Sequence, residues 1–174
     1  MHALWLEALS TMGPEHVNHQ ERPGVLPIAF SVNHQVRIED ASLVLLAGEP
    51  LLWNTEGWNQ RAQVAVDDLG RDTTVSEMER QRIGNYEAFC DYARRVYTRT
   101  EAWLFGLDPG RLADVLFRGS YPEFLQNAYI HRVVRDETVQ LSDAVECWIY
   151  QHGIRHLGEI EHARALVGLG GLTS

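Results

Sequence analysis

The chain has 174 residues, of which 45% are hydrophobic, so it can form one folded domain with a real core over residues 1–174. Its net charge of −9 argues against nucleic acid and anionic membrane surfaces as partners. All fifteen basic residues are arginine, which excludes lysine Schiff-base chemistry and a phosphate-loop lysine.

The cysteines and the hydropathy pattern indicate a cytoplasmic protein. Cys90 and Cys147 form no close-spaced pair, so no disulfide framework is expected. No apolar run approaches the length of a membrane span, and the N-terminus lacks the basic-then-apolar pattern of a signal peptide. We therefore expect a protein of the reducing cytoplasm that does not enter the membrane.

The first part of the chain predicts two helices. Residues 2–12 carry one apolar face, and Gly13-Pro14 ends that helix before a polar loop over residues 13–24. A second helix is expected from residues 26–27 to about residue 47. Its inward face is predicted to consist of Phe30, His34, Ile38, Ala41 and Leu45, with Glu39 and Asp40 on the solvated side.

A long connection is expected over residues 49–75, with a short helical turn around 60–67. Trp53 and Trp58 in this connection either pin it onto the helices or line a pocket. The sequence Ser76-Glu77-Met78-Glu79 has the capping-box pattern and predicts a third, long helix from Ser76 to about Phe105.

Residues 107–138 do not carry one long period. Short helices are predicted at 111–117 and 125–134, where they would cap one end of a bundle, and His131 is interpreted as a residue that does not bind metal. The last long helix is expected to start at residue 137 or 138 and to end at the glycines from Gly168 onward. The chain shows little period-two alternation, so we predict an all-α fold without a substantial sheet.

Three histidines are predicted to lie on the inward faces of two long helices. His152 and His156 are four residues apart and stack on one side of the last helix, and His34 interrupts the apolar face of the second. Three imidazoles from facing helices can hold a divalent ion with an open position, which suits zinc or nickel. A hydrogen-bonded network of core histidines without metal is the alternative.

Two neighbours of the histidine pair bear on its chemistry. Gly153 stands where zinc proteases carry glutamate after the first histidine, so protease chemistry is disfavoured. Glu159 follows His156 on the same face and is the candidate catalytic residue. It would act as a base or orient a ligand, and pairing with an arginine of another helix is an equal alternative.

The residues around these histidines resemble the DinB/YfiT-like superfamily, in the form found in actinobacteria. The last helix matches in His152-Gly-Ile-Arg-His156-Leu-Gly-Glu159, and the earlier helix matches from Pro27 through His34 to Asp40. The resemblance covers most of residues 26–60 and 138–170. It implies a four-helix bundle with long crossover connections, and a divalent metal held by His34, His152 and His156.

The resemblance also implies a homodimer and a small-molecule substrate. Relatives include transferases and isomerases that use a low-molecular-weight thiol, and metal-dependent hydrolases. In the thiol version, an arginine such as Arg37 or Arg155 would bind the carboxylates of the thiol. The alternative is a non-catalytic, stress-related bundle that binds metal.

Overall fold

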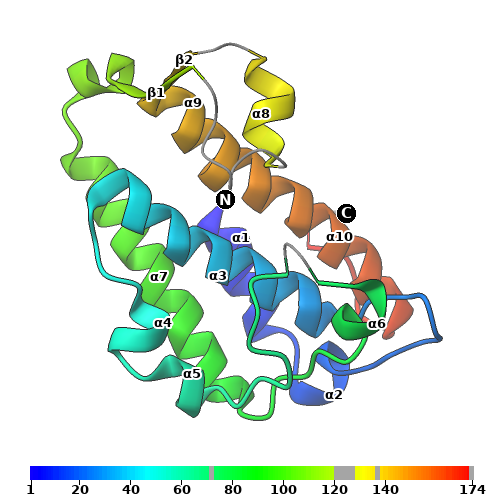
Figure 1. The fold of residues 1–174 in the computed structure, drawn as a ribbon. Coiled ribbons are helices and arrows are strands. Elements are labelled where there is room, and N and C mark those ends of the chain that lie inside the picture. Colours follow the sequence, from blue (N-terminus) through cyan, green and yellow to red (C-terminus); the bar gives the residue numbers. More distant parts are fainter. Residues whose placement is uncertain (71–72, 120–127, 136–137, 173–174) are drawn as a thin grey trace.

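Helix α3 (Ile28–Ala47) lies at the centre of the molecule and packs against both α7 (Tyr86–Gly106) and α10 (His152–Leu166) (Figure 1). The computed structural model describes residues 1–70, 73–119, 128–135 and 138–172. The N-terminal helix α1 (His2–Ser10) packs against α7. The described part of the chain is mostly helical and contains one small two-stranded sheet.

The ends of the first helices follow from their terminal residues. Helix α1 ends before Gly13-Pro14, as predicted, and the short helix α2 (Pro14–Val17) lies within the predicted loop. Pro27 precedes the first turn of α3, where its missing N–H leaves no helical bond unmade. Gly48 ends α3 in the left-handed region with φ of 69°, which glycine adopts without strain.

The prediction that Glu39 and Asp40 lie on the solvent-exposed side of α3 is wrong. Glu39 and Asp40 are fully buried, whereas Leu45, predicted to face inward, is 47% exposed. The reason is the position of α3: a helix with neighbours on several sides buries its polar positions too. Such groups are tolerated in a core only when they find hydrogen-bonding partners.

Asp40 is satisfied by several donors. Its carboxylate accepts hydrogen bonds from the backbone N–H groups of Leu52 (3.1 Å) and Trp53 (2.9 Å) and from the hydroxyl of Tyr92 (2.9 Å). It also forms an ion pair with Arg99 of α7. This buried carboxylate thereby joins α3, α7 and the start of α4 (Leu52–Thr55).

The connection after α3 contains α4 and a second short helix, α5 (Trp58–Arg61). Trp53 and Trp58 are 1% and 5% exposed and lie 5.0 Å and 5.9 Å from the ring of Tyr92. Both tryptophans therefore pin the connection onto the core, in agreement with the first of their two interpretations.

The predicted start of the third helix at Ser76 is wrong. A capping box forms two residues earlier, because Thr74 and Glu77 exchange side-chain and backbone hydrogen bonds. It opens only the one-turn helix α6 (Val75–Met78). Two overlapping capping-box patterns occur in this stretch, and the sequence pattern alone does not choose between them.

The long helix α7 begins ten residues after the predicted start. Before it, Ile83 forms an antiparallel bridge with Val64, so the chain is extended there. The side chain of Asn85 then caps α7 by accepting a hydrogen bond from the N–H of Ala88 at 3.1 Å.

One strand of the sheet lies where a short helix was predicted, and the other lies at the predicted start of the last helix. The 3₁₀ helix η1 (Pro109–Ala113) leads into strand β1 (Val115–Arg118), so the predicted helix at 111–117 is largely wrong. Strand β1 pairs antiparallel with β2 (Thr138–Gln140), with a bulge between Val115 and Phe117. Helix α8 (Tyr129–Val134) confirms part of the predicted helix at 125–134, whose first residues lie outside the described part.

The last helical stretch contains an irregularity that was not predicted. It begins at α9 (Leu141–Ala144), continues through the π-helical segment η3 (Val145–Gln151), and becomes regular in α10. The last helix was predicted to start at residue 137 or 138. Residue 138 belongs to β2, and residue 137 lies outside the described residues.

The π-helical segment ends directly before His152. Such segments are rare and are frequent at functional sites.

The buried apolar residues form two clusters. The larger one joins α1, α3, α7 and α10 through residues such as Trp5, Val36 and Leu157. The smaller one lies under β1, β2 and α8 and includes Trp148 and Ile149 of η3. The three histidines lie on α3 and α10, which are two of the helices that the larger cluster joins.

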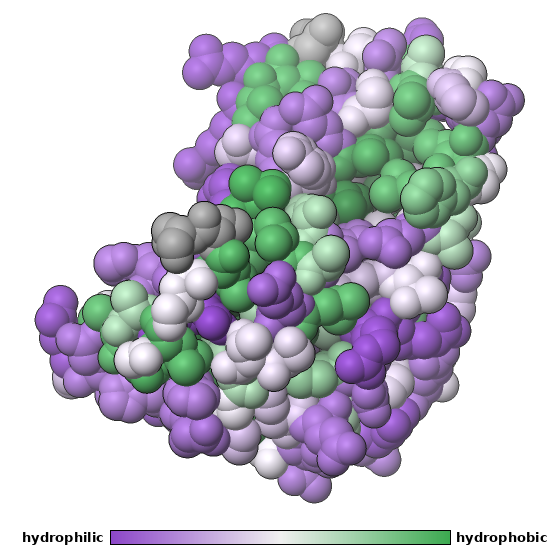
Figure 2. Space-filling model, turned by 180° about the vertical axis from the view of Figure 1, so that it is seen from behind, coloured by the Kyte–Doolittle hydropathy of each residue, from purple (hydrophilic) through white to green (hydrophobic). Residues whose placement is uncertain are grey.

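Figure 2 shows the molecule from behind relative to Figure 1. The lower half of this face is mainly hydrophilic, and apolar side chains gather toward its upper right. Phe105 at the end of α7 is 90% exposed. Among the described residues, no helix combines the length and the apolar character that a membrane crossing requires.

Candidate metal centre

His34 lies on α3, and its side chain is fixed from the connection between α3 and α7. Its Nδ1 makes a short hydrogen bond with the backbone carbonyl of Leu69. The ring of Phe30, one turn earlier on α3, stacks on it at 5.7 Å with an interplanar angle of 6°. Both contacts restrain the orientation of the imidazole.

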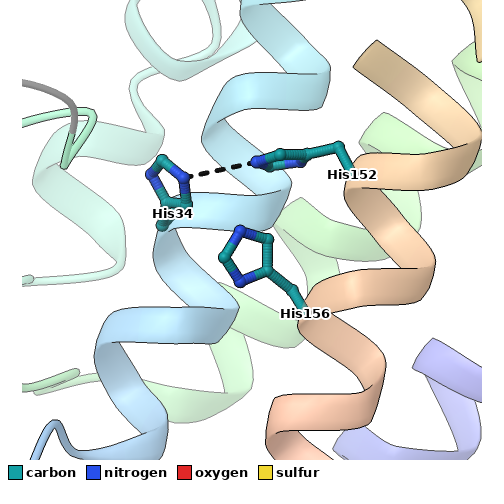
Figure 3. A group of neighbouring side chains, drawn as sticks. All are labelled: His34, His152 and His156. Atoms are coloured by element: carbon teal, nitrogen blue, oxygen red, sulfur yellow. Dashed lines mark hydrogen bonds between the residues drawn. The ribbon is translucent and has the colours of Figure 1, made fainter. Parts of the chain in front are cut away.

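His152 and His156 lie one turn apart on α10 and point toward His34 (Figure 3). The ring of His34 lies 5.1 Å from that of His152 and 4.9 Å from that of His156, and the rings of the α10 pair are 4.5 Å apart. One ring nitrogen from each residue lies within 4.8 Å of the others. The structure therefore brings together the three residues that the sequence predicts as metal ligands.

The pair on α10 is shielded from solvent. His156 is 8% exposed, and the Nδ1 atom of His152 is buried without a hydrogen-bond partner. Burial, followed by the nearby His156 and His34 and then Arg155, lowers the pKa of His152 to about 2. His152 is therefore neutral at physiological pH, which is the form that binds metal.

The hydrogen-bond partners also determine which ring nitrogens carry protons. A carbonyl oxygen only accepts, so Nδ1 of His34 donates to Leu69 and its Nε2 keeps a lone pair. Nδ1 of His156 lies 2.6 Å from the carboxylate of Glu159 and donates in the same way. Nε2 of His34 and Nε2 of His152 are 3.3 Å apart, so imidazole nitrogens face each other in the cluster. Imidazole nitrogens that face one another in this way fit a divalent ion such as zinc or nickel.

Within the part of the chain that the structure describes, the hydrogen-bond partners of the Glu159 carboxylate are His156 and Ser31, and neither is an arginine of another helix. The carboxylate accepts the hydrogen bond from His156, and the hydroxyl of Ser31 donates to the same oxygen at 3.3 Å. The hydrogen bond from His156 lowers the pKa of the Glu159 carboxyl, which is half exposed. A carboxylate on the outer nitrogen of a ligand histidine fixes its tautomer and raises its basicity.

The two arginines named for a thiol cofactor have different surroundings. Arg37 is buried, forms an ion pair with Asp67 at 2.9 Å and lies over the ring of Trp53 at 4.1 Å. Arg155 is exposed, lies over the ring of Tyr129 at 4.5 Å and contributes to the low pKa of His152. Arg155 is thus the one of the two that solvent reaches beside the histidines.

Two further residues are separate from the cluster. His131 is an exposed residue of α8, outside the group of three histidines. Cys90 lies on α7, where burial raises the pKa of its thiol, so it stays protonated at neutral pH.

Several residues that shape the site were not predicted. Ser31 donates to Glu159, and Leu69 and Gly70 contact His34 from the connection. The indole of Trp5 donates to the carbonyl of Gly153, the residue directly after His152, at 3.2 Å. The sequence around Trp5 and Leu69 carries no motif that marks such backbone contacts.

Comparisons with known proteins show the fold alone. No family model matches the chain, and no curated protein matches it. Among solved structures, the chain is similar to one described as the conserved protein of locus from Enterococcus faecalis, with a TM-score of 0.74 and 18% sequence identity. The similarity covers 96% of this chain and 91% of the other, so the whole helical fold is shared.

Proposed function

We propose that this protein is a metal-dependent enzyme in which His34, His152 and His156 hold a divalent ion, zinc or nickel. The observation that carries the proposal is the convergence of three ring nitrogens, from two helices, within 4.8 Å. The neutral state of His152 and the carbonyl and carboxylate partners of the other two rings support it. A divalent ion with three histidine ligands supplies Lewis acidity to a water or thiol at its open position.

The resemblance to the DinB/YfiT-like superfamily leads us to propose the corresponding four-helix bundle with long crossover connections. The packing of α3 against α7 and α10, and of α1 against α7, supports this assignment. We also propose a homodimer and a cytoplasmic location. Light scattering on the purified protein measures the subunit number.

The proposed reaction uses a small-molecule substrate and takes one of two forms. In the thiol-dependent transferase, Arg155 binds a carboxylate of a low-molecular-weight thiol, because this residue is exposed and its charge acts on His152. In the hydrolase, Glu159 accepts a proton from water, because its carboxylate lies beside His156 and half of its side chain is exposed.

A non-catalytic metal-binding protein is the second candidate function. The pocket that adjoins His34 is lined by Phe30, Asn33 and Gly70 among others, and it has room for about one water molecule. His152 and His156 do not line this pocket, and the shielding of His156, which is 8% exposed, favours metal binding over turnover of a substrate. An activity screen with thiols and electrophiles, with and without metal, separates the candidates, since turnover that requires both thiol and metal supports the transferase.

The metal site itself is tested by elemental analysis. We expect protein purified without a histidine tag to contain stoichiometric zinc or nickel, and the His152→Ala variant to lose it. His131→Ala is the matched control, because that exposed histidine lies outside the cluster. Equal metal content in the wild-type protein and the His152→Ala variant would refute the site.

A further inference from the structure

We propose that residues 66–70 form a positioning strap that holds His34 in its metal-binding tautomer and orientation, and that the strap requires glycine at position 70. The inference rests on the proposed metal site and concerns residues of the connection, far in sequence from the histidines of α10. The strap is the segment Val66-Asp67-Asp68-Leu69-Gly70, which crosses α3 beside His34.

The strap is anchored at its first two residues. The side-chain amide of Gln81 accepts from the N–H of Val66 at 3.0 Å and donates to its carbonyl at 2.8 Å. The carboxylate of Asp67 accepts from Arg37, one turn after His34 on α3, and from the indole of Trp53, both at 2.9 Å. Because Gln81 and Trp53 are buried, these anchors hold the strap against the folded core.

The strap then turns tightly onto His34. The side chain of Asp68 accepts from the N–H of Gly70 at 2.6 Å and from the hydroxyl of Thr73. This turn directs the carbonyl of Leu69 at Nδ1 of His34. The proton of the imidazole is therefore held on Nδ1, and the lone pair of Nε2 faces the pair on α10.

Gly70 meets two independent requirements. Its φ of 75° lies in the left-handed region, which side chains other than glycine adopt with strain. A Cβ at this position would lie 2.9 Å from Nδ1 of His34 and 2.9 Å from the ring of Phe30. An alanine would thus displace the same imidazole that the carbonyl of Leu69 orients.

The test compares Gly70→Ala with Gly57→Ala. Gly57 has a φ of 71°, but a Cβ there has no atom within 4 Å, so this control carries the backbone strain without touching His34. Zinc affinity is measured by competition with a chelator, and the tautomer of His34 in metal-free protein by ¹⁵N chemical shifts of the imidazole. We expect Gly70→Ala to bind zinc 10–100-fold more weakly and to lose the Nδ1-protonated signature, and Gly57→Ala to match the wild type.

The outcomes separate this inference from the proposed function. If Gly70→Ala and Gly57→Ala have the same zinc affinity and the same ¹⁵N shifts of His34, the proposed role of the strap is refuted. The proposed metal site is unaffected by that result. A wild-type protein that binds neither zinc nor nickel would refute the proposed function, while the ¹⁵N shifts of metal-free protein still decide whether the strap sets the tautomer. If Gly70→Ala does not fold, Asp67→Leu removes an anchor without backbone strain, and an unchanged affinity and tautomer in that variant would overturn the strap.

Discussion

Glu159 accepts a hydrogen bond from His156 and is also half exposed, so it has access both to a proposed metal ligand and to solvent. We predict that Glu159→Gln weakens zinc binding about 10–100-fold, because a neutral amide polarises the imidazole less than a carboxylate does. Affinity is measured by chelator competition. Glu146→Gln, at an exposed carboxylate of η3, is the control and should bind like the wild type.

The same variant distinguishes the two roles of Glu159. An activity that recovers fully at saturating zinc identifies an orienting residue, whereas a loss that persists identifies a catalytic base. Equal zinc affinity in Glu159→Gln and Glu146→Gln would contradict the orienting role.

At the scale of single residues, the sequence predicts the histidine cluster but not its supports. His152 and His156 are four apart, so helical periodicity places them on one face of the last helix, whereas their meeting with His34 depends on the packing of α10 against α3. The Leu69 carbonyl is 35 residues from His34 and is a backbone group, so no residue type at that position reveals it. In the sequence, Gly70 cannot be distinguished from other loop glycines, because its special role depends on its closeness to the imidazole of His34.

At the scale of elements, α3 depends on a buried carboxylate that connects it with two neighbours. We predict that Asp40→Asn lowers the free energy of unfolding by about 3–5 kcal/mol, because Arg99 loses its charged partner inside the protein. Urea denaturation measures the change. Asp91→Asn is the control: its ion pair with Arg94 is exposed, and its loss should cost less than about 1 kcal/mol. Similar values for both variants would contradict a structural role of Asp40.

The helices were predicted better than their faces and starts. The end of α3 follows from Gly48, and the buried residues Phe89, Val96 and Tyr97 of α7 recur at helical spacing. The polar side of α3 was misassigned, because amphipathic reasoning assumes that one side of a helix meets water. The small sheet was missed, because strands of three and four residues are too short to establish an alternating period.

At the scale of the whole molecule, His2 connects α1 with the two helices beneath it. Its Nε2 lies 3.0 Å from the buried carboxylate of Glu39 on α3, and its Nδ1 lies 3.0 Å from the exposed carboxylate of Glu101 on α7. Its ring also stacks on Tyr97 at 4.5 Å. Burial alone lowers the pKa of His2, but the carboxylates of Glu39 and then Glu101 outweigh it, and the pKa lies above its ordinary value.

This raised pKa predicts the pH dependence of stability. The folded state binds the His2 proton more tightly than the unfolded state, whose pKa is about 6.5. The stabilisation is therefore fully present below about pH 6.5 and is lost as pH rises through the folded pKa. Urea denaturation between about pH 6 and 9 should show a smaller decline in His2→Gln than in the wild type, whereas the control His19→Gln, at an exposed loop histidine, should keep the wild-type slope. Identical slopes in all three proteins would contradict the prediction.

The π-helical segment before His152 sets the rotational phase of the last helix. Residues upstream of it and within it, such as Leu141 and Trp148, belong to the smaller apolar cluster, and residues downstream, such as Leu157 and Ile160, belong to the larger one. Each π turn closes its hydrogen bond one residue later than an α turn, so the segment offsets these two faces around a shared axis. The π-helical segment therefore links two orientations: that of His152 and His156 on α10, and that of the upstream residues that pack under β1 and β2.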